Sequence, residues 1–250
     1  MEIETYVDAN GLRRCTVCNA LKQVRIFGKV IPCICNCEEA ADKAEAERRQ
    51  AEAIKAEHKR NAFQDGTETV IRSATFANDN GKTGKLMSYC KGYAEGFTTS
   101  SAWLVLYGDV GVGKSYAAAA IANHLLENCF SVRFTTLTQF ERKLWNAQNK
   151  DAVYAEYRWC DLLVLDDLGI SRATQYMNEI LFTLVDERLQ SGKPMIVTTN
   201  MSAKEMLQND DTSIKRIMSR LVQKSTMIEC KGKDQRLEAF MQRGALTFDE

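Results

Sequence analysis

The sequence lacks an excess of charge of either sign. Its 250 residues contain 33 lysine and arginine residues and 33 aspartate and glutamate residues, so the formal net charge is zero. This balance excludes the global positive field that a protein coating duplex DNA would use, although it allows a local basic face. Any contact with nucleic acid must therefore be confined to one region.

Long hydrophobic runs are also missing. No stretch approaches the length needed to span a bilayer, and the first residues, MEIETYVDANG, lack the basic segment followed by an apolar run that directs export. Proline is scarce, with two residues, whereas hydrophobic residues make up 45% of the chain. We expect a soluble, cytoplasmic protein without membrane partners, built as one large domain or one with a small appendage.

Composition divides the chain into three regions. We expect a cysteine-rich head over residues 1–37, a charged helix and linker over 38–74, and a main domain over 75–250. In the main domain, short apolar runs alternate with amphipathic stretches, which predicts an α/β fold with a parallel sheet flanked by helices. The expected strands are Trp103–Tyr107, Val132–Thr135, Leu162–Leu165 and Met195–Thr198, and the expected helices are Ser115–Glu127, Leu137–Ala147, Tyr176–Ser191 and Ile214–Val222.

A glycine-rich segment follows the first expected strand. GDVGVGKS, residues 108–115, matches the phosphate-loop pattern G-x-x-x-x-G-K-[ST]. Glycines let successive amides face one anion, and the start of the next helix adds its positive end. We expect Lys114 to reach the terminal phosphates of ATP and Ser115 to hold Mg²⁺. The expected nucleotide-binding residues are Gly108, Asp109, Val110, Gly111, Val112, Gly113, Lys114, Ser115 and Tyr116.

Polar residues end two further expected strands. DLLVLDDLG places Asp166 and Asp167 at the ligand-binding edge of the sheet, and KPMIVTTN places Asn200 there. We expect Asp166 to hold Mg²⁺, Asp167 to orient the attacking water, and Asn200 to donate to that water or to the terminal phosphate. Capping of the following turn is the alternative for the acidic pair, and initiation of a turn is the alternative for Asn200.

Basic residues gather near the carboxyl terminus. Eight lysine or arginine residues and three acidic residues lie in 214–243, and Arg216 and Arg220 share one face of an expected helix. A guanidinium at a subunit boundary can stabilise charge on a neighbour's phosphate. Taken alone, Arg220 and Arg236 are ordinary surface arginines.

Five of the nine cysteines lie between residues 15 and 37. CTVC contains Cys15 and Cys18, and CICNC contains Cys33, Cys35 and Cys37. In a reducing compartment such a cluster favours metal ligation over disulfides, and two chelating pairs suit tetrahedral zinc, which takes four ligands. We expect Cys15 and Cys18 to bind Zn²⁺ with two of the other three, and which two stays open. A loose, reduced cluster is the alternative.

Together these motifs resemble the DnaC-type helicase loaders of the AAA+ class, with IstB-type transposition ATPases as close relatives. The resemblance covers roughly residues 75–243 and depends on WLVLYGDVGVGKS, SVRFTTLTQFERKLW, DLLVLDDLG, KPMIVTTN, IMSRL and GKDQR. It implies an AAA+ ATPase domain behind a zinc-binding head, Asn200 as first sensor, Arg220 as a finger reaching the adjacent subunit, and Arg236 as second sensor. Many AAA+ enzymes have glutamate where this chain has Asp167. The shorter side chain of aspartate implies that ATP hydrolysis is slow and serves regulation.

The resemblance also implies partners. A loader of this type holds a DnaB-type hexameric replicative helicase through its head, binds single-stranded DNA through its ATPase domain and self-associates on the helicase. Segment 132–145 matches the DNA-contacting region and offers Arg133, Phe140, Arg142, Lys143 and Trp145, although its aromatic residues fit a core role equally well. The alternatives are an ATPase accessory to a transposase and an adaptor that binds nucleotide without hydrolysing it.

Overall fold

The structure, a computed structural model, describes residues 4–64, 66–81, 83–169, 174–207 and 212–243. The chain divides into two compact units, Met1–Ile54 and Lys55–Glu250. Helix α1, Asn36–Ala62, begins in the first unit and ends in the second. Among the described residues, no helix combines the length and the hydrophobicity needed to cross a membrane.

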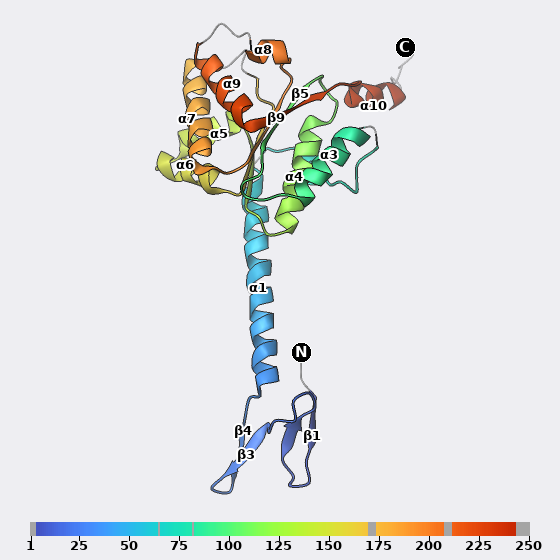
Figure 1. Ribbon diagram of the computed structural model, residues 1–250, viewed down its shortest axis with the longest axis vertical. Coiled ribbons are helices and arrows are strands. Elements are labelled where there is room, and N and C mark those ends of the chain that lie inside the picture. The colour runs from blue at the N-terminus through green and yellow to red at the C-terminus, as the bar shows by residue number, and fades with distance from the viewer. Residues whose placement is uncertain (1–3, 65, 82, 170–173, 208–211, 244–250) are drawn as a thin grey trace, which may run out of the picture. The chain divides into compact units, whose positions relative to one another are not determined.

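The first unit starts with two antiparallel hairpins (Figure 1). β1 (Thr5–Val7) pairs with β2 (Arg13–Cys15), and β3 (Gln23–Ile26) pairs with β4 (Lys29–Pro32). Cys15 and Cys35 are its only buried side chains within residues 4–54. A segment with so little buried apolar surface needs another source of stability, such as a metal.

The second unit is built on a five-stranded sheet in which every pairing is parallel. Its strand order is β6-β7-β8-β5-β9. The bounds are β5 Trp103–Gly108, β6 Val132–Thr136, β7 Leu162–Asp166, β8 Met195–Thr199 and β9 Ser225–Cys230. The four expected strands are present, and the α/β prediction is confirmed. Strand β9 was not expected, because it lies at the edge of the sheet, is only partly buried and has no continuous apolar run.

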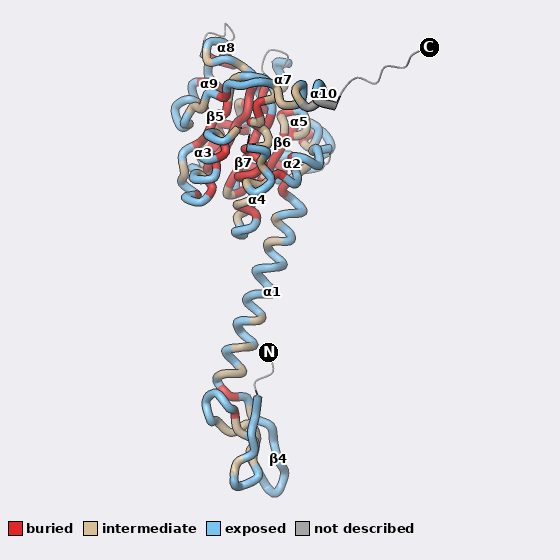
Figure 2. The backbone as a smooth tube through the Cα atoms, turned by 90° about the vertical axis from the view of Figure 1, so that its right-hand side faces the viewer, coloured by how far each residue is buried: buried red, intermediate tan, exposed pale blue. Residues whose placement is uncertain are grey.

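Helices cover both faces of the sheet. Those expected are α4 (Lys114–Glu127), α5 (Leu137–Asn146), α7 (Gln175–Ser191) and α9 (Thr212–Lys224). Those not expected are α2 (Thr69–Arg72), α3 (Gly84–Glu95), α6 (Lys150–Trp159), α8 (Ala203–Leu207) and α10 (Gln235–Arg243). Figure 2 shows the strands as the buried centre of this unit.

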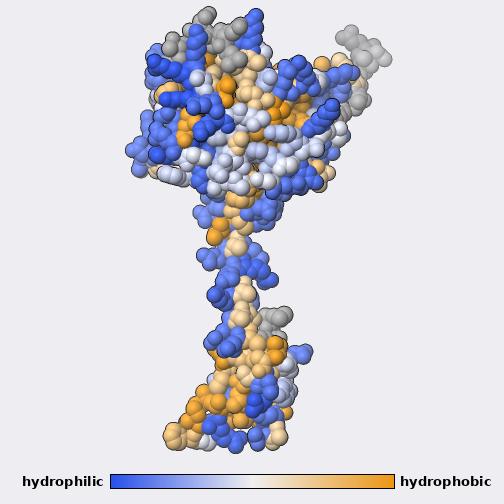
Figure 3. Space-filling view, viewed as in Figure 1, coloured by the Kyte–Doolittle hydropathy of each residue, from blue (hydrophilic) through white to orange (hydrophobic). Residues whose placement is uncertain are grey.

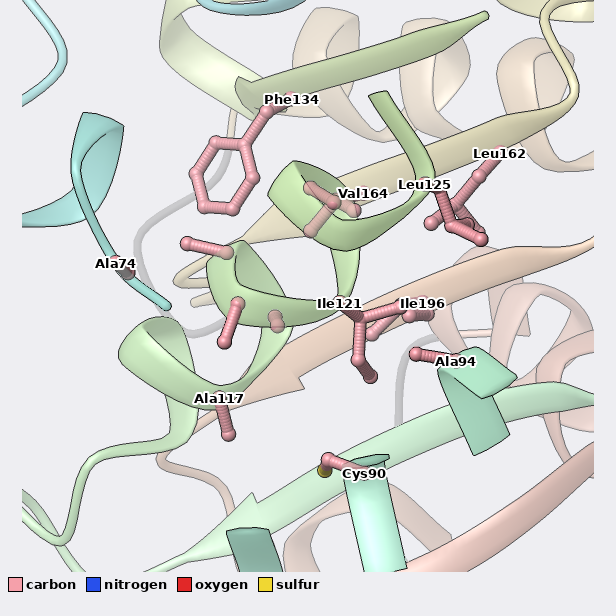
Figure 4. Close-up of a cluster of buried hydrophobic side chains, with 14 of the residues drawn as sticks. Ala74, Cys90, Ala94, Ala117, Ile121, Leu125, Phe134, Leu162, Val164 and Ile196 are labelled. Atoms are coloured by element: carbon pink, nitrogen blue, oxygen red, sulfur yellow. The ribbon is translucent and has the colours of Figure 1, made fainter. Parts of the chain in front are cut away.

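Two apolar cores lie on opposite faces of the sheet. Along β5, Leu104 and Leu106 belong to one core, and Trp103 and Val105 belong to the other. Successive strand side chains point to opposite faces, so a strand covered on both faces is apolar at every position. On the first face, the buried residues 117–120 of α4 are all alanine, and their small side chains let the helix lie close to the strands (Figure 4).

Candidate functional site

A cleft of about 690 Å³ lies where the phosphate loop meets the carboxyl ends of β7 and β8. It collects most of the residues expected to bind or hydrolyse ATP. These are Val110, Gly111, Gly113, Lys114, Ser115, Tyr116, Asp166, Asp167, Asn200 and Arg236. Parallel strands place these residues together, because their carboxyl ends meet at one edge of the sheet.

The phosphate loop has the backbone conformation that its glycines allow. Gly108, Gly111 and Gly113 have φ angles of 116°, 73° and 92°, in the region that favours glycine. Gly113 also begins α4. The following lysine, Lys114, is buried, and its ammonium group donates to the backbone oxygens of Gly108, at 3.0 Å, and Asp109. Burial lowers the pKa of Lys114, while nearby acidic groups oppose the shift.

The beginning of α10 packs against this loop. A Cβ atom added to Gly111 would lie 2.0 Å from Oδ1 of Asp234, and one added to Gly108 would lie 2.5 Å from the backbone oxygen of Cys230. The amide of Gln235 donates to the oxygen of Gly111 at 3.1 Å. Backbone conformation favours glycine at both 108 and 111, and at 108 the close approach of the Cys230 backbone requires it as well.

The acidic pair occupies two different environments. Asp166 ends β7 and is buried, and it accepts a hydrogen bond from Thr198 at 2.6 Å. Burial raises the pKa of Asp166, and hydrogen bonds from Thr198 and Ser115 oppose that shift. Asp167 is exposed, with a φ of 50°. The carboxylate of Asp166 and the hydroxyl of Ser115 are hard oxygen ligands, so this pair fits Mg²⁺.

Two residues at the end of β8 connect the acidic pair. The hydroxyl of Thr198 bonds to Asp166 and also accepts from the amide of Asp167 at 2.9 Å. The side-chain amide of Asn200 donates to the carboxylate of Asp167 at 3.1 Å. The sequence pattern places Thr198 at the same strand end as Asn200, but it gave no reason to assign Thr198 a role in the site.

A second set of cleft residues was not expected. Asn78, Asp79, Asn80 and Thr83 line it from the segment before α3. The side chain of Asn80 donates to that of Gln235 at 2.9 Å, which connects this segment to α10 beside Arg236. The asparagine-rich sequence here indicates only a turn, so it gave no signal of a role in the site.

Arg220 lies apart from the other expected residues. In the part of the chain that the structure describes, it does not line the cleft. It lies on α9, where Nη1 is 2.6 Å from Oδ1 of Asp186 on α7 and the guanidinium is 4.2 Å from the centre of the Phe182 ring. A role at an adjacent subunit stays a prediction.

The segment expected to contact DNA separates into core and surface residues. Phe140 is fully buried, and its ring lies 4.6 Å from that of Tyr157, so its role is in the core. Arg133 and Lys143 both lie beside Glu156, at 3.6 Å and 2.6 Å. Arg142 is exposed, and Trp145 is 76% exposed.

Four of the five head cysteines form a cluster. The Sγ atoms of Cys15, Cys18, Cys35 and Cys37 all lie within 4.8 Å of one another. Cys33 lies outside this cluster, and its Sγ contacts the backbone oxygen of Ile31 at 3.9 Å. Ligands at the usual zinc–sulfur distance of about 2.3 Å would lie about 3.8 Å apart at the corners of a tetrahedron. The four thiols therefore fit one Zn²⁺ with little rearrangement.

Comparison with known proteins identifies relatives of the chain. The family described as "IstB-like ATP binding protein" matches residues 38–242. The replicative helicase loader DnaI of Bacillus subtilis is 27% identical over 161 residues, which cover 59% of this chain and 51% of DnaI. A putative insertion sequence ATP-binding protein of Sinorhizobium fredii is 30% identical over 148 residues, which cover 57% of this chain and 48% of that protein. The chain thus matches about half the length of these relatives.

A solved structure supports the fold. The crystal structure of the DnaC helicase loader aligns with a TM-score of 0.58 and 19% identity, and the alignment covers 66% of this chain and all of that one. At this identity the likeness concerns the AAA+ fold alone. The chain is thus similar to the helicase loaders DnaI and DnaC, and since the family match extends over more than half of it, the protein belongs to the IstB-like ATP-binding family.

Proposed function

We propose that this protein is an ATP-dependent helicase loader that holds a hexameric replicative helicase and binds single-stranded DNA. One observation carries the proposal: the phosphate loop, the acidic pair and Asn200 meet in a single cleft, on a chain that also has a cysteine-rich head. The names of the relatives DnaI and DnaC support the helicase as partner.

Each cleft residue has a chemical task in this proposal. Lys114 exchanges its contacts with loop carbonyls for contacts with the terminal phosphates. Ser115 and Asp166 hold Mg²⁺, which neutralises charge that develops on those phosphates. Asp167 and Asn200, which already share a hydrogen bond, orient the attacking water. Arg220 supplies positive charge to the site of an adjacent copy, and Arg236 contacts nucleotide from α10.

The expected rate is low, because aspartate at 167 has a shorter reach than glutamate. Phosphate release, measured with and without single-stranded DNA, tests this step. We expect Lys114→Ala to abolish release by weakening ATP binding, and Asp167→Ala to abolish it while ATP still binds. Unchanged release in both variants would contradict the proposed site, and tight ATP binding without release by the unmodified protein would favour the adaptor alternative.

The head is the proposed docking region for the helicase. Its hairpins expose Ile26, Phe27, Val30 and Ile31, and Figure 3 shows hydrophobic surface on this unit. Exposed apolar groups gathered on a small unit are typical of a protein-binding surface. In a pull-down with ATP present, we expect the full chain to retain a replicative helicase and the Phe27→Ser variant to lose it. Absence of association by the unmodified chain would exclude the helicase as partner.

The second candidate is an ATPase that assists a transposase. The insertion sequence protein of Sinorhizobium fredii and the family description favour it. The two functions share the ATP cleft, so ATP hydrolysis does not separate them. The two functions are separated by parallel pull-downs, one with a replicative helicase and one with an insertion-sequence transposase. We expect the chain to retain the helicase alone.

A further inference from the structure

Helices α7 and α9 hold the side chain of Arg220 from two directions. Asp186 contacts Nη1 at 2.6 Å, and the Phe182 ring lies against the guanidinium, with its centre 4.2 Å away. Phe182 and Asp186 are four residues apart on α7, so they share one face of that helix. The second carboxylate oxygen of Asp186 accepts a hydrogen bond from Gln190 at 2.9 Å, which orients the carboxylate in turn.

Stability does not account for this arrangement. The side chains of Arg220 and Asp186 are 32% and 33% exposed, and ion pairs this open to solvent contribute little to folding. The contacts instead restrict the rotamers of a long, flexible side chain. Asp186 engages one edge of the guanidinium and Phe182 one face, and a guanidinium has five N–H donors, so others stay available for a second anion.

We propose that Asp186 and Phe182 are positioning residues, which orient Arg220 toward the terminal phosphate of ATP bound to an adjacent copy of the chain. The inference depends on the proposed function, in which Arg220 acts on a neighbour. A side chain that is ordered before the neighbour arrives loses less conformational freedom on reaching the phosphate. Asp186 and Phe182 thus act through Arg220 and do not touch nucleotide.

The first test compares ATP turnover by the assembled full-length protein with single-stranded DNA present. We expect Asp186→Asn to lower kcat about tenfold with an unchanged KM for ATP, and Arg220→Ala to lower kcat about a thousandfold. Phe182→Leu, which keeps an apolar side chain but removes the ring, should resemble Asp186→Asn. Glu179→Gln is the matched control, because it removes the same charge from an exposed position two turns earlier on α7, and it should leave kcat unchanged.

The second test asks whether Asp186 acts on the neighbouring subunit. Lys114→Ala chains have no working phosphate loop but carry an intact Arg220, so an excess of them should restore turnover by Asp186→Asn chains in mixed assemblies. Lys114→Ala chains should also restore turnover by Arg220→Ala chains. The double variant Lys114→Ala/Asp186→Asn should restore less of it than Lys114→Ala alone. A purely local structural role of Asp186 predicts no restoration by Lys114→Ala, and that result would overturn the inference.

The outcomes also separate this inference from the proposed function. Full activity of Arg220→Ala would remove the finger role from the proposed function, and the positioning role with it. Loss of activity in Arg220→Ala, combined with full activity in Asp186→Asn and Phe182→Leu, would overturn the positioning role alone.

Discussion

At the scale of single residues, the site depends on two side chains near the end of β8 that hold the acidic pair in place. Thr198 bonds to both members of the acidic pair, and Asn200 bonds to the exposed member. In the proposed function these contacts orient Asp167 and Asn200 toward the attacking water. The two carboxylates differ in environment, since Asp166 is buried and Asp167 is exposed, and this difference suits the separate tasks proposed for them.

Trp145 is the residue whose substitution best tests the contact with DNA. It is 76% exposed on α5, beside the exposed Arg142, and stacking of a base on an aromatic side chain typically stabilises single-strand complexes by about 1–3 kcal/mol. We expect Trp145→Ala to weaken the binding of a labelled oligonucleotide by about tenfold, measured by fluorescence anisotropy. Trp159→Ala is the control, because that tryptophan is exposed outside segment 132–145. Equal binding by Trp145→Ala and the unmodified chain would remove Trp145 from the interface.

At the scale of elements, Arg188 joins α6, α7 and the beginnings of two strands. This fully buried side chain of α7 donates to backbone oxygens of Tyr157, Arg158, Cys160, Asp161 and Pro194. A charge removed from water is tolerated when its donors are paired, and five carbonyl partners provide that pairing here. The same α7 carries Phe182 and Asp186, so Arg188 also fixes the helix that holds Arg220.

Replacement of Arg188 is expected to destabilise the second unit strongly. Arg188→Met keeps much of the apolar volume but leaves several buried carbonyl oxygens without donors, and each such group costs about 1–3 kcal/mol. We expect a loss of about 3–5 kcal/mol in the free energy of unfolding, measured by urea denaturation. Arg216→Met, at an exposed position on α9, should change it by about 0.5 kcal/mol or less. Similar urea concentrations at the midpoint of unfolding for the two variants would contradict the structural role of Arg188.

The head is the second element with a clear experimental test. We expect one Zn²⁺ per chain by metal analysis, because the four clustered thiols match the number of ligands that zinc takes. Cys37→Ser should lose the metal. Cys33→Ser is the matched control and should retain it, since Cys33 lies outside the cluster. A folded head without metal, or loss of zinc from both variants alike, would contradict this ligand set.

At the scale of the whole molecule, ATP binding should be visible as stability of the second unit. A ligand present at 100 times its Kd stabilises the folded state by about 2.7 kcal/mol. For a unit of this size, that corresponds to a rise of about 5–10 °C in the Tm of its unfolding transition. We expect this rise with ATP and Mg²⁺ in the unmodified protein and none in Lys114→Ala. An equal rise in both would place the nucleotide elsewhere.

The sequence predicted the centre of this molecule better than its edges. Four buried strands were recognisable as continuous apolar runs, and the positions of the candidate site residues at the ends of three of them followed from this. The partly buried β9 carried no such run. The presence of Cys37 rather than Cys33 in the cluster depends on which way a short segment turns. The partners of Arg220, Asp186 and Phe182, lie 34 and 38 residues earlier in the chain, on another helix. Contacts of this kind come from tertiary packing, which local pattern does not encode.

The four consecutive alanines of α4 have a consequence for how the ATP site can change. Residues 117–120 are buried and follow directly after Lys114, Ser115 and Tyr116. Consecutive residues of a helix point in different directions, so some of these methyl groups face the strands and others face the neighbouring helices, and their small size allows close packing on both sides. A larger side chain at one of these positions would displace the beginning of the helix and, with it, Lys114. In the proposed function, a substitution in this buried layer therefore changes nucleotide affinity without replacing any residue that contacts the nucleotide.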